Sequence, residues 1–234
     1  MQLHLMLSGE NIRLPMASQY SIQGLIYHLL GSYAQEIHTD KYQLGDKRFR
    51  LFTFGPPRGS YRVEGKTLCF PLGFSLEVRS CDPGIIQAIL QHITLSPTVH
   101  LLGQPVRISQ VRLENKTIFQ DCITVKTLTP VTVYTTTETG KTLYFSPTHE
   151  NFPQYIHQNA LSKWCSLPGN QPFPSLQVET LFVGRKIVTM YKGTVINAWH
   201  GTFRLTGQPQ VLDFLYQTGL GSKNAQGMGM IECN

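Results

Sequence analysis

The sequence predicts an α+β protein made of two tandem ferredoxin-like (RRM-like) domains, and two observations carry this prediction. In the first half, segments with strand and helix periodicity follow one another as strand, helix, strand, strand, helix, strand, which is the β-α-β-β-α-β order of that fold. The second half repeats this order loosely. The 234 residues suffice for two cores, and we expect the domains to cover residues 1–115 and 121–234.

Residues 1–8 are expected to form the first strand, because leucines alternate there with other residues as in a strand with one buried face. The next element is a helix in which isoleucines and leucines recur at helical spacing. Ser18 offers an N-cap for this helix, and Gly31 is well placed to end it. A short second helical piece, residues 33–37, leads to His38.

The middle strands of the first half are predicted by aromatic and alternating residues. The run F-R-L-F-T-F at 49–54 favours a strand, which Gly55 and the prolines after it break. Residues 67–70 and 74–79 are expected to pair as a hairpin, because Pro71 and its neighbours separate them at turn distance.

The first half closes with a helix and a strand. Asp82 is expected to cap the helix, with Pro83 at its first position, and the helix carries a stripe of isoleucine and leucine. Residues 106–113 alternate imperfectly and are expected to form the last strand of this half.

The second half contains the same kinds of element, although its strand pattern is less regular. In order, these are a β-rich segment over 123–134 that Pro130 interrupts, a short strand over 141–145, a helix over 151–164, a long hairpin of 176–191 with 193–205 that turns near Lys192, a helix from Pro209 to Gly219, and a terminal strand over 228–233.

Composition excludes several classes of protein. Apolar residues make up 41% and charged residues 15%, which is too apolar for a disordered chain, and the formal net charge of +6 predicts a mildly basic surface. No run of 18 apolar residues is present, and residues 1–15 lack the basic start and apolar stretch of a secretory signal. We therefore expect a soluble, cytoplasmic protein that makes no membrane contact.

Neither a metal site nor a disulfide framework is predicted. No C-x-x-C pair occurs, and single cysteines favour small buried thiols in a reducing compartment. The five cysteines are Cys69, Cys81, Cys122, Cys165 and Cys233. The fourteen acidic residues form no array suited to hard cations, which disfavours a metal-dependent nuclease or phosphatase. We expect no metal and no other cofactor.

The sharpest local signal is a glycine-rich segment near the end of the chain, G-L-G-S-K-N-A-Q-G-M-G at 219–229. Glycine lets a backbone approach a phosphate closely and turn its N–H groups toward the anion, and Lys223 adds a positive charge. The spacing is not that of a P-loop, and the segment follows a predicted helix instead of opening one, which disfavours a nucleotide cofactor. A plain loop before a strand is the alternative interpretation.

This ending resembles the glycine-rich loop of the CRISPR-associated repeat-RNA endoribonucleases, the Cas-six family of the RAMP superfamily. The family pattern is glycine, hydrophobic, glycine, five residues with at least one basic, then glycine, hydrophobic, glycine, and residues 219–229 fit it in full. Further blocks resemble the family in its own order: Y-S-I-Q-G-L-I-Y-H at 20–28, R-L-F-T-F at 50–54, L-T-P-V-T-V at 128–133 and A-W-H-G-T-F-R at 198–204.

The resemblance implies an endoribonuclease that matures crRNA by cutting CRISPR repeat RNA in the precursor without a metal ion. The 2′-hydroxyl attacks the adjacent phosphate and leaves a 2′,3′-cyclic phosphate and a 5′-hydroxyl end, which requires a base, an acid and positive charge on the phosphorane. The alternative is a related subunit that binds crRNA without cutting it. Other CRISPR-associated subunits and a second copy of the chain stay open as partners.

Three residues match the family's usual tyrosine, histidine and lysine set, with one departure. His38 stands at the histidine position, and a reference pKa of about 6.5 suits acid–base work near neutrality. Tyr27 lies outside the apolar stripe of the first helix, where its hydroxyl would orient the 2′-hydroxyl or a phosphate oxygen. Arg50 replaces the lysine; it stabilises the phosphorane but stays protonated, so His38 is expected to carry most of the proton transfer.

Other interpretations of these positions stay open. His38 could be a surface histidine at a helix end, with His28 as its rival. Tyr27 could be an amphipathic side chain that flanks the groove between the domains. Lys47 or Lys41 could supply the catalytic amine in place of the arginine.

RNA binding is expected to use a basic strip and not a deep pocket. Trp199 and His200 lie in a predicted strand, where a core tryptophan is favoured over a base-stacking one. The residues that we expect to bind RNA are Lys223, Gly221, Gly227, Gly229, Asn224, Arg185 and Lys186.

Overall fold

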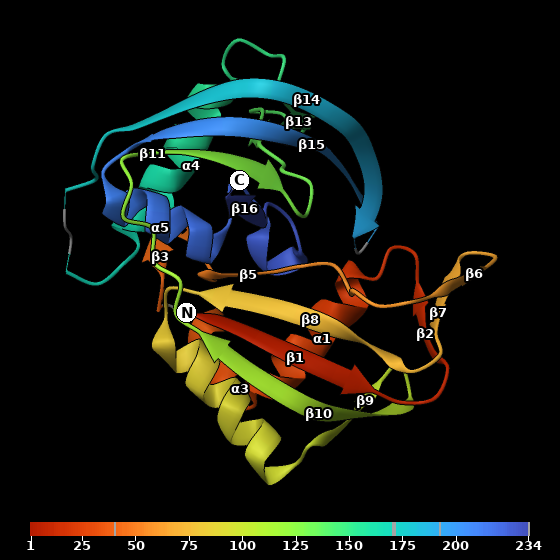
Figure 1. Cartoon of the computed structure of the whole chain (residues 1–234). Helices are drawn as coiled ribbons and strands as arrows, with labels where there is room; N and C mark the ends of the chain where they lie inside the picture. Colours follow the sequence, from red (N-terminus) through yellow and green to blue (C-terminus); the bar gives the residue numbers. More distant parts are fainter. Residues whose placement is uncertain (40, 170–171, 192, 234) are drawn as a thin grey trace.

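The computed structural model describes residues 1–39, 41–169, 172–191 and 193–233. It contains two main antiparallel sheets that lie one above the other in Figure 1. The first sheet has the order β5-β8-β1-β10-β9. Its strands are β1 (Gln2–Ser8), β5 (Phe52–Phe54), β8 (Gly73–Ser80), β9 (Thr98–Leu101) and β10 (Gln104–Glu114). The neighbours β10, β1, β8 and β5 follow the ferredoxin-like order, with β9 added at the edge.

Three helices cover the first sheet: α1 (Gln19–Leu30), α2 (Tyr33–His38) and α3 (Pro83–Leu95). The cap predicted for α3 is confirmed, because the Gly84 N–H donates to Asp82 Oδ1 at 2.9 Å and Pro83 lies in the first turn. Ser18 precedes α1 as predicted, but its side chain makes no capping hydrogen bond. The isoleucines and leucines of α1 are buried, as their spacing predicts.

The second sheet has the order β14-β15-β11-β16, which repeats the ferredoxin-like arrangement. Its strands are β11 (Cys122–Thr127), β14 (Leu176–Tyr191), β15 (Thr194–Gly207) and β16 (Ile231–Cys233). Its helices are α4 (Phe152–Cys165), α5 (Pro209–Thr218) and the 3-10 turn η1 (Asn224–Gln226). The α+β class and the tandem arrangement agree with the sequence prediction. The predicted turn residue Lys192 lies outside the described residues.

The predicted hairpin of 67–70 with 74–79 is wrong. Strand β7 (Thr67–Phe70) pairs with β2 (Ile12–Pro15) and β6 (Arg62–Glu64) in a separate small sheet, whereas β8 pairs with β1 and β5. The chain changes sheets at Gly73, where a Cβ would lie 1.9 Å from the Leu7 carbonyl oxygen. Alternation identified both strands but carries no information about their partners.

The strand expected over 49–54 is shorter than predicted. Only 52–54 form β5, because Phe49 and Arg50 turn back toward α2. The Phe49 N–H donates to the Tyr42 carbonyl at 2.8 Å, next to a small hairpin of β3 (Gln43–Leu44) and β4 (Lys47–Arg48). This turn places Arg50 beside the end of α2.

Two further strands complete the second half, and the hairpin of β14 and β15 reaches across the molecule. Strands β12 (Tyr134–Thr136) and β13 (Thr142–Tyr144) pair with each other in a two-stranded sheet. In Figure 1, β14 and β15 arch over the second half and descend toward α1. Trp199 on β15 is buried, as the core interpretation predicts.

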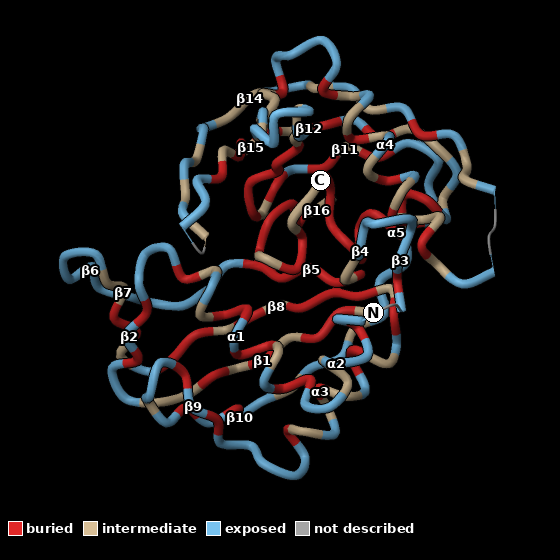
Figure 2. The backbone as a smooth tube through the Cα atoms, turned by 180° about the vertical axis from the view of Figure 1, so that it is seen from behind, coloured by how far each residue is buried: buried red, intermediate tan, exposed pale blue. Residues whose placement is uncertain are grey.

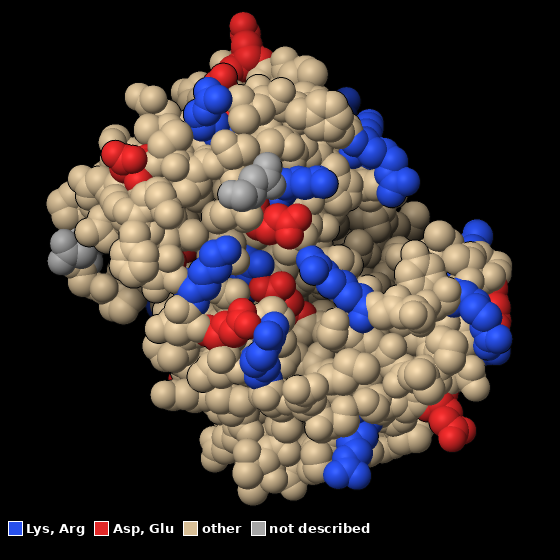
Figure 3. Space-filling model, in the orientation of Figure 1, with Lys and Arg blue, Asp and Glu red and all other residues tan. Residues whose placement is uncertain are grey.

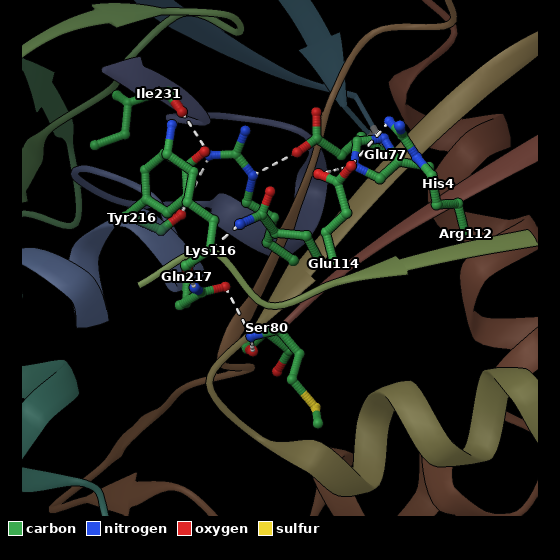
Figure 4. Close-up of polar contacts among 12 residues, drawn as sticks. His4, Glu77, Ser80, Arg112, Glu114, Lys116, Tyr216, Gln217 and Ile231 are labelled. Carbon is green, nitrogen blue, oxygen red and sulfur yellow. Dashed lines mark hydrogen bonds and ion pairs between the residues drawn. The ribbon is translucent and has the colours of Figure 1, made fainter. Parts of the chain in front are cut away.

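The two halves are joined by a polar interface, in which Figure 4 shows Glu77, Tyr216, Gln217 and Ile231 close together, and Arg79 bonds to two of these residues. Its guanidinium is buried and donates to Glu77 Oε1 and to the Ile231 carbonyl, both at 2.6 Å. It also lies over the ring of Tyr216 at 4.0 Å. Nearby, Gln217 accepts from the Met1 amine at 2.9 Å. Through Arg79, strand β8 of the first half is therefore hydrogen-bonded to β16 and packed against α5 of the second half.

Burial follows the two sheets, as Figure 2 shows, with β5 and β8 largely buried and β6 exposed. The five cysteines are free. Cys69 is buried as predicted. Cys122, at the start of β11, is exposed, and the other three are only partly buried, so the expectation of buried thiols is wrong for Cys122 and holds only in part for those three. Within the described residues no helix is long and apolar enough to cross a membrane.

Candidate functional site

Three side chains expected to do chemistry meet at one place. The rings of Tyr27 and His38 stack with centroids 4.8 Å apart, and Arg50 Nη2 lies 3.0 Å from His38 Nδ1. Tyr27 comes from α1, His38 ends α2, and Arg50 precedes β5. The ring of Tyr27 also packs edge-on against buried Phe52, with centroids 6.1 Å apart. The core therefore fixes one member of the cluster.

The bond between Arg50 and His38 defines the state of the imidazole. A guanidinium has donors and no acceptor, so His38 Nδ1 accepts in this arrangement and the neutral ring carries its proton on Nε2. Arg50 Nε is buried and has no hydrogen-bond partner among the described residues. An arginine with a donor left over is suited to bind an anion.

The Tyr27 hydroxyl is a hydrogen-bond donor at neutral pH. Its burial raises its pKa above the ordinary value of a tyrosine, and the neighbouring Arg50 guanidinium opposes this shift only in part. A phenol in this state is a poor base, so its place in the cluster is suited to orienting an oxygen atom.

The segment that carries His38 is tied to one carboxylate. Tyr33, at the start of α2, donates to Asp82 Oδ2 at 2.8 Å, and the Lys41 ammonium lies 3.0 Å from the same oxygen. Burial would raise the pKa of Asp82, but hydrogen bonds from Tyr42, Tyr33 and Lys41 hold it below its usual value. Lys41 is therefore paired with Asp82. Of the two alternative amines, Lys47 lines the same pocket as Tyr27, His38 and Arg50, and Lys41 does not.

The cluster opens into a cleft of about 780 Å³ between the two halves. α1, α2 and β4 line one side, and α4 and the glycine-rich segment line the other. Its aromatic residues include Tyr134, Tyr155 and Tyr191. Among the described residues no acidic side chain lines this cleft, whereas its basic side chains are Lys47, Arg48, Arg50, Lys163 and Lys223. The cleft is thus built for an anionic ligand with flat, apolar groups.

The glycines of the 219–229 segment are required by close packing. Gly221, Gly227 and Gly229 all have positive φ values, between 70° and 80°. A Cβ at Gly229 would lie 1.9 Å from the Leu220 carbonyl oxygen, and one at Gly221 would lie 2.6 Å from that of Thr132. These contacts explain why glycine is needed at these positions for packing of the loop. The close approach of a phosphate to the glycines stays a prediction.

Asn224 holds this loop together from within. Its side chain is buried and donates to the carbonyls of Leu220 and Met228, at 3.2 and 3.1 Å, while its oxygen accepts from Lys163. The amide expected to bind RNA is thus occupied by the loop itself. Contact of Asn224 with RNA stays a prediction. Because the side-chain amide is already bonded within the loop, such a contact would have to use the backbone of Asn224.

Lys163 on α4 is a residue that sequence reasoning missed. It is only 3% exposed, and its ammonium donates to the Gly219 carbonyl at 2.6 Å and to Asn224 Oδ1 at 3.1 Å. Desolvation lowers its pKa from 10.5 to about 7. A lysine in an amphipathic helix is usually solvated, so no sequence signal marks this one.

Lys223 faces the cleft at the tip of the loop. Its ammonium lies 4.8 Å from the centre of the Tyr134 ring, and partial burial lowers its pKa. Arg185 and Lys186 are exposed on β14 and do not line the cleft; the Lys186 ammonium lies 5.6 Å from the ring of Trp199. If they bind RNA, they do so outside the cleft. His28 stacks edge-on with His92, away from the cleft.

Replacing Lys223 by alanine is expected to weaken RNA binding several-fold at low salt. Loss of one phosphate contact should also reduce the slope of log K against log salt by about 0.7 for single-stranded RNA. Titration of a labelled repeat RNA at four salt concentrations measures both quantities. Lys66→Ala, at an exposed turn, is the control; equal slopes in both variants would contradict a phosphate contact at Lys223.

Charges outside the cleft are mixed. On the face shown in Figure 3, Lys and Arg side chains are interleaved with acidic ones around the junction of the two halves. Among the described residues no group of three or more histidine, cysteine or acidic side chains is placed to hold a metal ion. The basic side chains of the cleft, by contrast, have no acidic neighbours among the residues that line it.

Comparison with known proteins gives consistent results. Residues 113–233 match the family model described as CRISPR associated protein Cas6, C-terminal. The chain is 26% identical, over 94% of its length and 83% of the relative's, to the CRISPR-associated endoribonuclease Cas6 of Pyrococcus furiosus. Two solved structures have a TM-score of 0.82. One is a Cas6-related protein of Pyrococcus furiosus, with 20% sequence identity over all of this chain and 98% of that one. The other is described as an RAMP protein binding different RNA substrates, with 19% identity over all of this chain and 99% of that one.

The family match covers more than half of the chain and contains the whole glycine-rich segment. The similar structures span both halves, including the part that the family model leaves out. Together these findings confirm the resemblance found in the sequence, and the chain belongs to the Cas6 family of CRISPR-associated proteins.

Proposed function

We propose that this protein is an endoribonuclease that cuts CRISPR repeat RNA without a metal ion, by attack of a 2′-hydroxyl on the adjacent phosphate. One observation carries the proposal: Tyr27, His38 and Arg50 meet at a cleft lined by basic and aromatic side chains, with no acidic one among the described residues. The names of its relatives, an endoribonuclease and an RNA-binding RAMP protein, support the same substrate class.

The first step follows from the contact between Arg50 and His38. A phosphate is a stronger acceptor than a neutral imidazole, so RNA in the cleft draws the guanidinium away from Nδ1. The freed Nδ1 takes the proton of the 2′-hydroxyl as the bond between that oxygen and phosphorus forms. Tyr27, which stays protonated, orients the reacting oxygen.

The second step breaks the bond between phosphorus and the 5′-oxygen. Arg50 neutralises the charge that builds on the phosphorane, and the imidazolium of His38 gives a proton to the leaving oxygen. The products are a 2′,3′-cyclic phosphate and a 5′-hydroxyl, and His38 returns to its neutral form. Arg50 keeps its proton throughout, so the chemistry assigned to a lysine in the family is divided here between an arginine and a histidine.

Incubation of the protein with a repeat RNA in EDTA tests this proposal. We expect a single cut, fragments with cyclic-phosphate and 5′-hydroxyl ends by mass spectrometry, and no cut when the attacking 2′-hydroxyl is replaced by hydrogen. A metal requirement, or a cut deoxy substrate, would refute the mechanism. Tight binding of intact RNA would identify the protein as a non-catalytic crRNA-binding subunit.

A further inference from the structure

A buried glutamine on α1 joins the catalytic cluster to the opposite wall of the cleft. Gln23 is 8% exposed, and its Nε2 donates to the Ala225 carbonyl at 2.6 Å, within η1 of the glycine-rich segment. Its Oε1 accepts from the Tyr191 hydroxyl at the end of β14. One side chain of the first half thus contacts two separate elements of the second half.

The chemistry of the two partners fixes the orientation of this amide. A carbonyl oxygen accepts and never donates, so the nitrogen of Gln23 must face Ala225 and the oxygen must face Tyr191. An apolar side chain would remove the donor that the Ala225 carbonyl uses and the acceptor that the Tyr191 hydroxyl uses. An ionised glutamate would present an oxygen to the Ala225 carbonyl and lose that contact. Among side chains of this size and shape, a neutral amide alone satisfies both partners.

The position of Gln23 connects it to the cluster. Tyr27 lies four residues later, one helical turn along the same face of α1. Tyr191 approaches closely enough to raise the pKa of Tyr27, and its ring packs edge-on against Tyr20 with centroids 5.6 Å apart. On the other side, Ala225 lies two residues after Lys223 and next to Asn224, the centre of the loop.

We propose that Gln23 is a positioning residue that sets the separation between the catalytic cluster on α1 and α2 and the glycine-rich loop opposite. It does so through the Ala225 carbonyl and the Tyr191 hydroxyl, and it contacts no reacting atom. This inference rests on the proposed function for its kinetic consequence. Since an error of about 1 Å in the placement of reacting groups costs up to about a hundredfold in rate, loss of the junction acts on the chemical step.

The interface in Figure 4 supplies a matched control. Gln217 is 3% exposed, and its side chain accepts from the Met1 amine and donates to the Lys116 carbonyl at 3.0 Å. It is therefore a buried glutamine that also connects the two halves, but it does not line the cleft. Substitution there disturbs the interface in general without touching the proposed junction.

The test compares Gln23→Leu and Gln217→Leu in single-turnover cleavage with saturating enzyme, in RNA binding and in melting temperature. We expect Gln23→Leu to slow cleavage about tenfold or more, with the Kd for uncut RNA within threefold. Gln217→Leu should lower the melting temperature and leave the cleavage rate within twofold. Equal rates for the wild type and Gln23→Leu, or equal slowing by both variants, would overturn the inference.

Gln23→Glu adds a second measurement, the pH dependence of the cleavage rate, which a general loss of stability would not change. Once protonated, its carboxyl group can donate to Ala225 and accept from Tyr191, and burial raises the pKa of such a carboxyl. The ratio of the variant's rate to the wild-type rate should therefore rise from pH 8 to pH 6. A ratio that does not change with pH would contradict the orientation of the junction.

Amide hydrogen exchange separates this inference from the proposed function. Gln23→Leu should speed exchange in residues 219–229 relative to Gln217→Leu, whether or not the wild type cuts RNA. If the wild type cuts no RNA but loop exchange changes as expected, the proposed function fails and the junction stands. If the wild type cuts RNA, but Gln23→Leu changes neither the loop exchange nor the cleavage rate, the role of Gln23 is refuted and the proposed function stands.

Discussion

Replacing His38 by alanine should reduce the cleavage rate by about 10²–10⁴-fold, the usual contribution of general acid–base catalysis. Its imidazole stacks on Tyr27 and accepts from Arg50, so it is the one group in the cluster that can both take and give a proton near neutral pH. RNA affinity should stay within several-fold, because the basic residues of the cleft are retained. Single-turnover assays in EDTA measure the rate, and binding to RNA with a 2′-deoxy scissile position measures the affinity.

His28→Ala is the matched control for this variant. His28 is exposed on α1, one residue from Tyr27, and packs against His92 instead of facing the cleft. Its loss should leave cleavage within twofold. Near-wild-type cleavage by His38→Ala, or an equal loss in His28→Ala, would remove the imidazole at 38 from the mechanism and leave Tyr27 and Arg50 without a proton carrier.

Most of the fold could be predicted from periodicity because buried faces repeat at fixed intervals. The leucines of β1, the apolar stripe of α1 and the Asp82–Pro83 cap of α3 all depend on neighbours within a few residues. The pairing of β7 depends on β2, more than fifty residues away, and no local pattern reports it. Sequence therefore predicted elements better than it predicted contacts between them.

The candidate site shows the same division. His38 and Arg50 were selected by resemblance to a family and not by periodicity, which gives no reason why residue 50 should turn back to α2. Gln23 and Lys163 carried no signal at all, because a polar residue in an amphipathic helix is ordinarily solvated. Their roles arise only where the second half closes over the first, and that long-range geometry is absent from any short window of sequence.

Lys163 should make the protein more stable as the pH rises above 7. Burial lowers its pKa to about 7, whereas in the unfolded chain it stays near 10.5, so unfolding takes up a proton between these two values. The free energy of unfolding therefore rises with pH, by at most about 1.4 kcal/mol per unit, or about 2 kcal/mol from pH 7 to pH 9. Below pH 7 both states hold the proton and this contribution no longer changes.

Both hydrogen bonds of Lys163 survive this titration, since a neutral amine still donates to Gly219 and to Asn224 Oδ1. What the rise in pH removes is a buried charge that has no acidic partner among the described residues. Lys163→Met should remove this contribution to the pH dependence. The stability of the wild type relative to the variant should therefore increase by about 2 kcal/mol from pH 7 to pH 9.

Urea unfolding at pH 5, 7 and 9 measures these differences, with Lys66→Met as the control for a lysine that is exposed in the folded protein. The control should follow the wild type at all three values, and Lys163→Met should diverge from it only above pH 7. Parallel curves for the wild type and Lys163→Met would mean that the ammonium keeps its proton. In that case Lys163 would keep a positive charge next to the glycine-rich loop at all three pH values. The affinity of the cleft for anions would then not fall as the pH rises through neutrality.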